Sequence, residues 1–330
     1  MLRSLVSPVQ NGEDGELFLR RNLTRESLEA AFAAHDVMWL DVVDATDEEI
    51  RWLEKLLSLH PAVVSDLRRD DRRPTLMIYP DYLFLSLFQP SLKVNQLTSE
   101  EVHCLVGDHF FVTVRKESTN TVASAYDRMA QSTEYWRRGA TYFLYTTIQF
   151  VVDAYYPLLD RISNQLNQLE ESVLLNGGKT AQQAVYRIKQ QLIHLRQMVA
   201  PQREVVSSVI GEARLSRSNE DRDLFRHLYE RLLRVYDVID SQRDLASNVL
   251  DLMESQSSTK MANAVSRLTI LSMIFLPLTF IVGLFGINFI TTQPELVIQL
   301  PGVTVLMFIL MLTFLSAFGL AWFFRRQGWL

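Results

Sequence analysis

Polar side chains are scarce in the apolar run near the C-terminus, and their types suit contact with a cation. Thr269, Ser272 and Thr279 lie inside the run, and Asn288 ends it. Hydroxyl and amide oxygens can hydrogen-bond the water shell of an ion or replace part of it. An apolar helix face that leads to an amide at one mouth would make a gated pore, provided that a kink at Pro277 corrects the helical drift. The positions that could share this face are Val265, Leu268, Leu276, Thr279, Phe285 and Asn288.

A plainer interpretation of the same residues stays open. Ser and Thr hydroxyls in helices often bond back to a carbonyl one turn earlier, and a proline can kink a membrane helix without any role in transport. The pore interpretation also carries a requirement, because two helices per chain cannot enclose a pore. It therefore predicts a homo-oligomer.

Membrane-spanning helices must position these residues. Two spans are expected, at about residues 267–288 and 301–324 of a transmembrane domain over 267–330. The chain carries no charge between Arg267 and Glu295 or from Leu296 to Phe324, and each run reaches the ~20 apolar residues that cross a bilayer. The loop between them has no Lys or Arg, whereas basic residues flank the outer ends of both runs. By the positive-inside rule, the loop faces the periplasm or the outside and both termini face the cytoplasm. We therefore expect a multi-pass protein of the plasma membrane, which is the inner membrane in a bacterium.

A long helix is predicted to lead into the first span. From Asn219 the chain meets neither Gly nor Pro until Pro277, which allows a rod on the order of 100 Å at 1.5 Å per residue. Most of this stalk must stand in the cytoplasm, because the hydrocarbon core is only about 30 Å thick. The stripe of acidic residues along it is either an ordinary solvated face or a funnel that concentrates cations. Its members are Asp237, Asp240, Asp244, Asp251 and Glu254.

The first 118 residues mix strands with helices and are expected to form an α/β cytoplasmic domain. Thr46 and Glu49 predict a helix that begins with a capping box. A turn at Gly107-Asp108 is predicted to join the last two strands. After residue 118 the strand signals stop, so residues 119–266 are expected to form long helices, the first of them over 141–175. The predicted strands are residues 37–42, 75–79, 82–88, 102–106 and 110–114.

Composition excludes several classes of function. The 330 residues carry a formal charge of −5, with 38 acidic and 33 basic side chains, so nucleic acid is not an expected partner. Cys104 is the single cysteine, which suits a reducing cytosol. The N-terminus lacks the apolar segment of a signal peptide. Motifs of nucleotide-binding proteins, zinc proteases and serine hydrolases are missing, so we do not expect an enzyme.

One local group of metal-binding residue types has an unfavourable spacing. His103, Cys104 and His109 lie on the two strands of the predicted hairpin. A turn at Gly107-Asp108 would place His109 opposite Val106, so the two imidazole rings would not oppose each other. Because structural metal sites need several ligands around one point, we do not favour a site here.

The end of the first apolar run has a distinctive sequence. It reads PLTFIVGLFGINF over residues 277–289, followed by PEL at 294–296 and a basic-tryptophan tail at 325–330. These residues resemble the CorA family of divalent cation transporters, and so do His60-Pro61, Asp66 and Arg73-Pro74 in order and spacing. The hallmark of that family at the end of the first membrane helix is Gly-Met-Asn. The resemblance covers essentially the whole chain. It implies a funnel-shaped homopentamer with an α/β cytoplasmic domain and a pore lined by the first membrane helix of each subunit.

The resemblance also assigns roles to particular residues. Gly286, Ile287 and Asn288 would form the selectivity filter, and Glu295 would concentrate cations at the outer mouth. A ring of Asn288 amides would contact the hydrated ion, since magnesium gives up its water reluctantly. No cofactor would stay permanently bound, because the divalent cation is the cargo and could also act as a regulator.

Departures from the family pattern leave the transported ion open. Ile287 stands where most members have Met, and Gly-Ile-Asn occurs in the zinc-transporting ZntB branch, whereas Glu295 is typical of magnesium transporters. In magnesium-sensing members, a pair of Asp residues from neighbouring subunits holds a regulatory ion. Asp66 matches one of them, but His227 stands at the other position, and an imidazole suits zinc better than magnesium. His227 could equally be an ordinary exposed side chain.

These patterns together predict a CorA-type channel in the lipid bilayer. Its function would be passive influx of Mg²⁺, with Co²⁺ and Ni²⁺ also admitted, through a homopentamer. One alternative is a ZntB-like Zn²⁺ transporter that could be coupled to protons. An alternative from another class is a membrane-anchored scaffold without transport, against which the polar positions of the first helix and the acidic loop argue.

Overall fold

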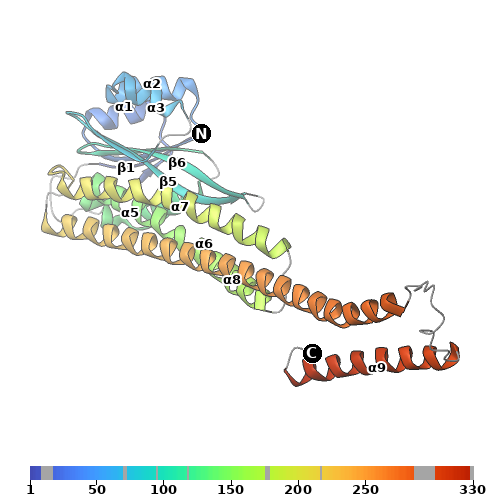
Figure 1. Ribbon diagram of the computed structural model, residues 1–330. Coiled ribbons are helices and arrows are strands. Elements are labelled where there is room, and N and C mark those ends of the chain that lie inside the picture. The colour runs from blue at the N-terminus through green and yellow to red at the C-terminus, as the bar shows by residue number, and fades with distance from the viewer. Residues whose placement is uncertain are drawn as a thin grey trace. The chain divides into compact units, whose positions relative to one another are not determined.

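The chain folds into two compact units, Met1–Leu250 and Asp251–Leu330. The structure, a computed structural model, describes residues 1–8, 18–69, 73–93, 96–116, 119–174, 179–215, 218–285 and 302–327. In the first unit a sheet lies between two groups of helices (Figure 1). The predicted division into three domains, at residues 118 and 266, stays a prediction.

One mixed sheet of seven described strands organises the first unit, in the order β2-β1-β3-β7-β6-β5-β4. β3 and β7 are parallel, and all other neighbouring pairs of described strands are antiparallel. This sheet confirms the predicted α/β class. The strands are β1 Leu2–Ser7, β2 Arg20–Arg21, β3 Val37–Val43, β4 Thr75–Ile78, β5 Leu83–Lys93, β6 Gln96–Val106 and β7 Phe110–Arg115.

Alternate strand residues build a separate core on each face of the sheet. Leu40 and Phe84 lie in the core under α1, α2 and α3. On the opposite face, the Trp39 ring lies 5.5 Å from Phe143 of α5 and 5.6 Å from Tyr126 of α4. Figure 1 shows α1–α3 on one side of the sheet and α5 and α7 on the other. The helices are α1 Arg25–Ala33, α2 Asp47–Leu57, α3 Pro61–Leu67, α4 Asn120–Gln131, the short η1 Thr133–Arg138, α5 Gly139–Asp153, α6 Tyr155–Leu174, α7 Lys179–Gly211, α8 Asn219–Phe285 and α9 Gly302–Arg326.

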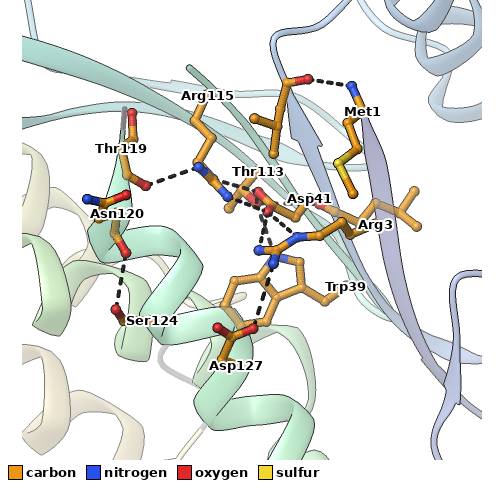
Figure 2. A network of polar contacts seen from close by, with 12 residues as sticks. Met1, Arg3, Trp39, Asp41, Thr113, Arg115, Thr119, Asn120, Ser124 and Asp127 are labelled. Atoms are coloured by element: carbon orange, nitrogen blue, oxygen red, sulfur yellow. Dashed lines mark hydrogen bonds and ion pairs between the residues drawn. The ribbon is translucent and has the colours of Figure 1, made fainter. Parts of the chain in front are cut away.

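A buried carboxylate joins three strands in the middle of the sheet. Asp41 of β3 is fully buried and accepts hydrogen bonds from Arg3 of β1 at 2.7 Å and from Arg115 of β7 at 2.9 Å. Thr113 donates to the same carboxylate at 2.8 Å and accepts from the Trp39 indole at 3.1 Å. Figure 2 shows the two guanidinium groups meeting at Asp41. Because both carboxylate oxygens are bonded, the buried charge is compensated.

The predicted single helix over residues 141–175 is wrong, because the chain breaks at Ala154 into α5 and α6. Tyr155, at the start of α6, donates a hydrogen bond to the Phe88 carbonyl at 3.0 Å and accepts one from the Gln202 amide at 2.6 Å. The Gln202 carbonyl oxygen in turn accepts the Phe88 N–H at 3.0 Å. We refer to Phe88, Tyr155 and Gln202 as the β5 clamp. It holds the helix junction against β5, and Pro157 in the first turn of α6 is the local sequence signal for the break.

The hairpin between β6 and β7 is present, but its predicted turn is wrong. Gly107 donates its N–H to the Phe110 carbonyl at 2.9 Å, so the turn consists of Asp108 and His109. His109 is therefore not opposite Val106. Gly107 is needed for close packing instead, since a Cβ there would lie 2.2 Å from the Phe110 ring.

Local sequence patterns predict an element correctly where the contacts that stabilise it are also local. The helix predicted from Thr46 is α2, and both hydrogen bonds of its capping box form. The sequence analysis does not predict β1 or α1, and it makes β5 and β6 too short. Pro90 lies inside β5, beyond the residues that pair with β4. A proline is tolerated there because no neighbouring strand needs its N–H.

Candidate functional site

Among the described residues, two helices are long and apolar enough to cross a membrane. The first is the C-terminal part of α8, which runs without interruption from Asn219 to Phe285 and includes Pro277. The second is α9, which covers most of the predicted second span. The predicted continuity of the long helix into the first span is confirmed.

Four of the predicted pore positions fall on one face of α8. Val265, Leu268, Leu276 and Thr279 lie within a sector of about 80° when each residue turns the helix by 100°. Val265, Leu268 and Leu276 expose 53%, 64% and 74% of their surface, and Thr279 is also exposed. Large apolar side chains in such a row need lipid or further protein to cover them. We call these four residues the open face of α8.

The side of α8 that is covered within its own unit lies about half a turn away from the open face. Ile270 is 5% exposed, and four further residues on the same side are half-buried, namely Ile274, Pro277, Leu278 and Ile281. In α9 the less exposed residues also form one stripe, which consists of Ile309, Leu312, Thr313, Ser316, Ala317, Leu320, Ala321 and Phe324. The open face is thus part of the exposed surface of α8, which also includes Leu271, Met273, Phe275 and Phe280.

The hydroxyl groups of this segment bond back to their own helix. Thr269, Ser272 and Thr279 each donate to the carbonyl four residues earlier, at 2.9 Å. This part of the plainer interpretation is confirmed. With their protons engaged, these side chains leave the open face largely apolar in character.

The predicted filter residues Gly286, Ile287 and Asn288, and the loop residue Glu295, lie outside the described residues. α8 ends directly before them at Phe285. On an ideal helix Phe285 lies about 160° around the axis from Val265. A face shared by these two residues therefore requires a change of helical twist between them, and it stays a prediction.

The two residues proposed for a regulatory ion do not meet within one chain. Asp66 lies near the end of α3 and is 2% exposed, whereas His227 is exposed on α8. The helices that carry them lie on opposite sides of the sheet (Figure 1). A shared ion would need two chains, as the resemblance implies, and α3 would have to expose Asp66.

The acidic stripe of α8 is partly neutralised inside the chain. Asp240 lies 3.1 Å from Arg196 of α7 and 3.2 Å from Arg243, which also lies 3.2 Å from Asp244. The Asp240–Arg196 pair joins α7 to α8, whereas the two pairs of Arg243 lie within α8, so Asp240 has a structural role. The other members of the stripe are exposed, namely Asp237, Asp251 and Glu254.

The His103, Cys104 and His109 group is not brought together. His103 Nδ1 is 2.9 Å from the Ser86 hydroxyl. Cys104 is fully buried, and burial raises the pKa of its thiol. The His109 ring lies against His35, 4.8 Å away. Across the described ranges, no group of three or more His, Cys, Asp or Glu residues could hold a metal ion.

The Asp41 network is the main polar feature that the sequence analysis misses. Its signal is a lone Asp inside the apolar strand segment VMWLDVV. A buried carboxylate of this kind needs cationic partners, but they lie 38 and 74 residues away along the chain, at Arg3 and Arg115. Periodicity alone could flag Asp41 without finding either partner.

Comparisons with known proteins give a consistent picture. Residues 34–326 match the family described as CorA-like Mg2+ transporter protein. The chain is 30% identical over 258 residues to the putative metal ion transporter YfjQ of Bacillus subtilis, covering 78% of this chain and 80% of that protein. It is 29% identical over 267 residues to the cobalt/magnesium transport protein CorA of Thermotoga maritima, covering 78% and 74%. A zinc transport protein ZntB of Yersinia pseudotuberculosis is 24% identical over 314 residues, covering 93% and 92%.

Solved structures share the fold. The complete CorA magnesium transporter from Methanocaldococcus jannaschii matches with a TM-score of 0.83 at 18% identity, covering 99% of this chain and 98% of that one. The full-length CmaX protein matches with a TM-score of 0.70 at 21% identity, covering 89% of each chain. At these identities the likeness concerns the fold alone.

A layered α/β unit, long helices and two apolar C-terminal helices define a membrane protein with a large soluble part. The family match extends over most of the residues, including both apolar helices. The chain belongs to the CorA family of metal ion transporters.

Proposed function

We propose that this chain forms a homopentameric channel for passive influx of Mg²⁺ that also admits Co²⁺ and Ni²⁺. The family description and the cobalt/magnesium transport protein of Thermotoga maritima support this choice of ions. The observation in this chain that carries the proposal is the open face of α8, a row of exposed apolar side chains opposite the side that its own unit covers.

In the proposed pentamer the open face of each α8 turns toward the central axis. A narrow apolar passage excludes water, and a hydrated ion cannot cross it until the passage widens. Leu276, the most exposed of the four residues at 74%, would form the tightest part of this gate. Thr279 keeps its hydroxyl proton on its own helix and adds little affinity for the ion.

At the outer mouth, the proposed filter works on the water shell of the ion. Mg²⁺ dehydrates reluctantly, so a ring of Asn288 amide oxygens would accept hydrogen bonds from its bound water, and Gly286 carbonyls would add oxygens beside Ile287. Glu295 would raise the local concentration of cations. A membrane potential contributes about 2.3 kcal/mol per charge per 100 mV, or about 4.6 kcal/mol for a divalent ion, which is enough to drive influx without coupling.

The charge distribution supports a bacterial inner-membrane protein with both termini in the cytoplasm. Arg267 precedes the first span, and Arg325 and Arg326 end α9. Positive residues at both of these ends favour the cytoplasmic side. Lipid is accordingly a partner of α8 and α9.

A zinc transporter is the rival within the family. Ile287 and the likeness to ZntB favour it, while Glu295 favours magnesium. Zinc transport coupled to protons predicts Zn²⁺ uptake that rises with an inward proton gradient. A regulatory ion between Asp66 of one chain and His227 of its neighbour would suit zinc better than magnesium.

Competitive uptake into liposomes tests the proposal. Full-length protein should transport Mg²⁺ and Co²⁺ in preference to Zn²⁺, at equal rates at two pH values. Asn288→Ala should abolish uptake, whereas Gln293→Ala, which removes an amide from the adjoining loop, should retain it. Unchanged flux in Asn288→Ala would reject the filter, and Zn²⁺ uptake that follows the proton gradient would select the rival ion.

The mass of the purified complex, measured together with its ion flux, distinguishes a channel from a membrane-anchored scaffold. A pentamer is expected in detergent. A verified pentamer without any ion flux would favour the membrane-anchored scaffold, and a monomer would contradict a pore formed by the open face.

A further inference from the structure

The stretch of α8 that leads into the first apolar span is exposed on all its sides within one chain. Every residue from 257 to 269 is exposed, whereas Ile270, the next residue, is 5% exposed. A helix of a folded domain usually buries one stripe of its surface against its own chain. This stretch of α8 is therefore open to lipid or to another chain.

A hollow lies along one side of this stretch. Its volume is about 570 Å³, and ligand pockets in proteins commonly measure about 300–1,000 Å³. Its described lining residues all belong to α8 and to the second unit, and they span about 140° of the helix surface. They are Lys260, Asn263, Ala264, Arg267, Leu268 and Leu271.

Two cationic side chains follow each other along the hollow. Lys260 and Arg267 are seven residues apart, which places them about 10 Å apart along the axis of α8 and within about 20° around it. Ala264 lies between them along the axis and leaves space, because its side chain is a single methyl group. The amide of Asn263 adds a hydrogen-bond donor at the edge of the hollow. Donors of this kind suit the oxygens of a phosphate group.

The positive charge of the hollow is not balanced by carboxylates nearby. Before Lys260 the nearest acidic residue along the chain is Glu254, which lies about 120° around α8 from it. No acidic residue follows Lys260 until Glu295, and α9 has none. Within the described ranges, neither Lys260 nor Arg267 forms an ion pair. A patch of one sign attracts ligands of the opposite sign, so the hollow favours an anion.

The lining changes from charged to apolar toward the membrane span. Lys260 lies furthest from the span, Arg267 lies at its first residue, and Leu271 lies one turn inside it. Leu268 and Leu271 expose 64% and 52% of their surface. The headgroup region measures roughly 5–7 Å on each side of the hydrocarbon core, and the flexible stem of Lys260 can reach into it from outside. A phospholipid has the same order of groups, with its phosphate at the surface and its acyl chains beyond.

The hollow is turned away from the open face of α8. When each residue turns the helix by 100°, the centres of the two surfaces lie about 110° apart around the axis. Leu268 stands at the boundary and belongs to both. In the proposed pentamer the hollow would therefore lie off the central axis.

We propose that this hollow binds an anionic phospholipid of the cytoplasmic leaflet, with the lipid phosphate at Arg267 and Lys260 and an acyl chain along Leu271. The inference rests on the proposed position of Arg267 at the cytoplasmic surface of the membrane, but not on which ion is transported. In the same topology Arg325 and Arg326 lie at that surface outside the hollow. They distinguish a defined site from the general attraction of basic residues to an anionic membrane.

Native mass spectrometry of the full-length protein in detergent tests this site with three probes. Phosphatidylglycerol offers an anionic phosphate with acyl chains, phosphatidylcholine offers the same chains without net charge, and glycerol phosphate offers the anion alone. Saturable binding of phosphatidylglycerol, roughly tenfold tighter than that of the other two, is expected. Equal binding of phosphatidylcholine, or no binding of any probe, would overturn the proposal. Equal binding of glycerol phosphate would assign the hollow to a soluble phosphate compound instead of a lipid.

Matched charge variants locate the binding. Lys260→Gln and Arg267→Gln should each weaken phosphatidylglycerol binding about fivefold, which is the typical contribution of one basic side chain at an anionic membrane. Arg325→Gln removes the same charge at the same surface but outside the hollow, so it should leave binding unchanged. Equal losses in all three variants would show general attraction and overturn the site.

Steric variants test the hollow itself. Ala264→Trp should abolish binding by filling the hollow without changing any charge. Ala262→Trp, about 160° around α8 from Ala264, should leave binding unchanged, and both alanines are exposed, so both variants should fold. Mg²⁺ uptake into phosphatidylcholine liposomes, measured in parallel, separates this inference from the proposed function. Uptake without any phosphatidylglycerol binding would reject the lipid site alone, and binding without uptake would reject the channel alone.

Discussion

At the centre of the sheet, the charge of Arg115 depends on one carboxylate. The Arg115 side chain is 4% exposed, and Asp41 is fully buried beside it. Asp41→Ala should lower the free energy of unfolding by about 3–5 kcal/mol, because it leaves a buried cation without its partner. Urea unfolding of the detergent-solubilised protein, followed by tryptophan fluorescence, would measure the loss.

Asp127 provides the control at the same scale. It lies 3.7 Å from Arg3 in the same network, but its side chain is 60% exposed. Asp127→Ala should cost about 0–1 kcal/mol, as exposed ion pairs do. Equal losses for the two variants would show that burial does not decide the strength of this network.

The thiol and imidazole residues show what sequence can and cannot predict for single side chains. Alternation along β6 correctly separates His103 from Cys104, because neighbouring strand residues face opposite sides. The contact of His109 with His35 depends on a turn that is shifted by one residue from the predicted one. Spacing along the chain holds no information on that contact.

At the scale of elements, α2 depends on a local hydrogen-bond pair. The Thr46 hydroxyl accepts the Glu49 N–H at 3.2 Å, and Glu49 accepts the Thr46 N–H at 2.9 Å. Thr46→Ala should destabilise the first unit by about 1 kcal/mol. Thr24→Ala, at the start of α1, should cost less, because the Thr24 hydroxyl makes one weaker bond, of 3.4 Å, to a helix N–H. Chemical denaturation of both variants would compare them.

The same cap predicts a dependence on acid. Burial acts to raise the pKa of Glu49, but hydrogen bonds from Thr46 and the charge of the N-terminus outweigh it and lower that pKa below the ordinary value of 4.5. A lowered pKa means that the ionised carboxylate stabilises the folded state above pH 4.5 and that this stability is lost as the pH falls through the folded pKa. Unfolding at a series of pH values below 5 should show a shallower loss in Glu49→Gln than in the unaltered protein. Identical slopes would contradict the assignment.

Elements were predicted well where their signals are local and poorly where distant contacts decide. The capping box predicts α2, and the lack of Gly and Pro predicts the length of α8. The break between α5 and α6 depends on Phe88 and Gln202, 67 and 47 residues away from Tyr155. Those two contacts have no local signal, but Pro157 in the first turn of α6 does mark the break, and the sequence analysis missed it.

At the scale of the whole molecule, the open face of α8 predicts how a variant should conduct. Leu276→Asn places an amide in an apolar passage, so water should fill it more readily. Lowering the barrier by ~1.4 kcal/mol would raise resting Mg²⁺ uptake about tenfold. Leu276→Met, which keeps the side chain apolar, should leave uptake unchanged. Reduced uptake in the Asn variant, in liposomes with equal protein content, would contradict a hydrophobic gate.

The family of the protein was more predictable than the ion it transports. Two uncharged runs and the sequence around Asn288 were enough to indicate the family, which the family match confirms over residues 34–326. In the proposed pentamer, the choice of ion would depend on how Ile287 and Asn288 of several chains surround one point. A single sequence does not encode that geometry in any local pattern.

The β5 clamp has a consequence for the behaviour of the protein in a crowded cell. Beyond the residues paired with β4, the outer edge of β5 would present unpaired backbone groups, and such edges recruit strands from other molecules. Gln202 and Tyr155 occupy both the N–H and the carbonyl of Phe88 at this edge. The helix layer thereby blocks edge-to-edge aggregation, and the same two side chains that set a helix boundary keep the sheet from growing.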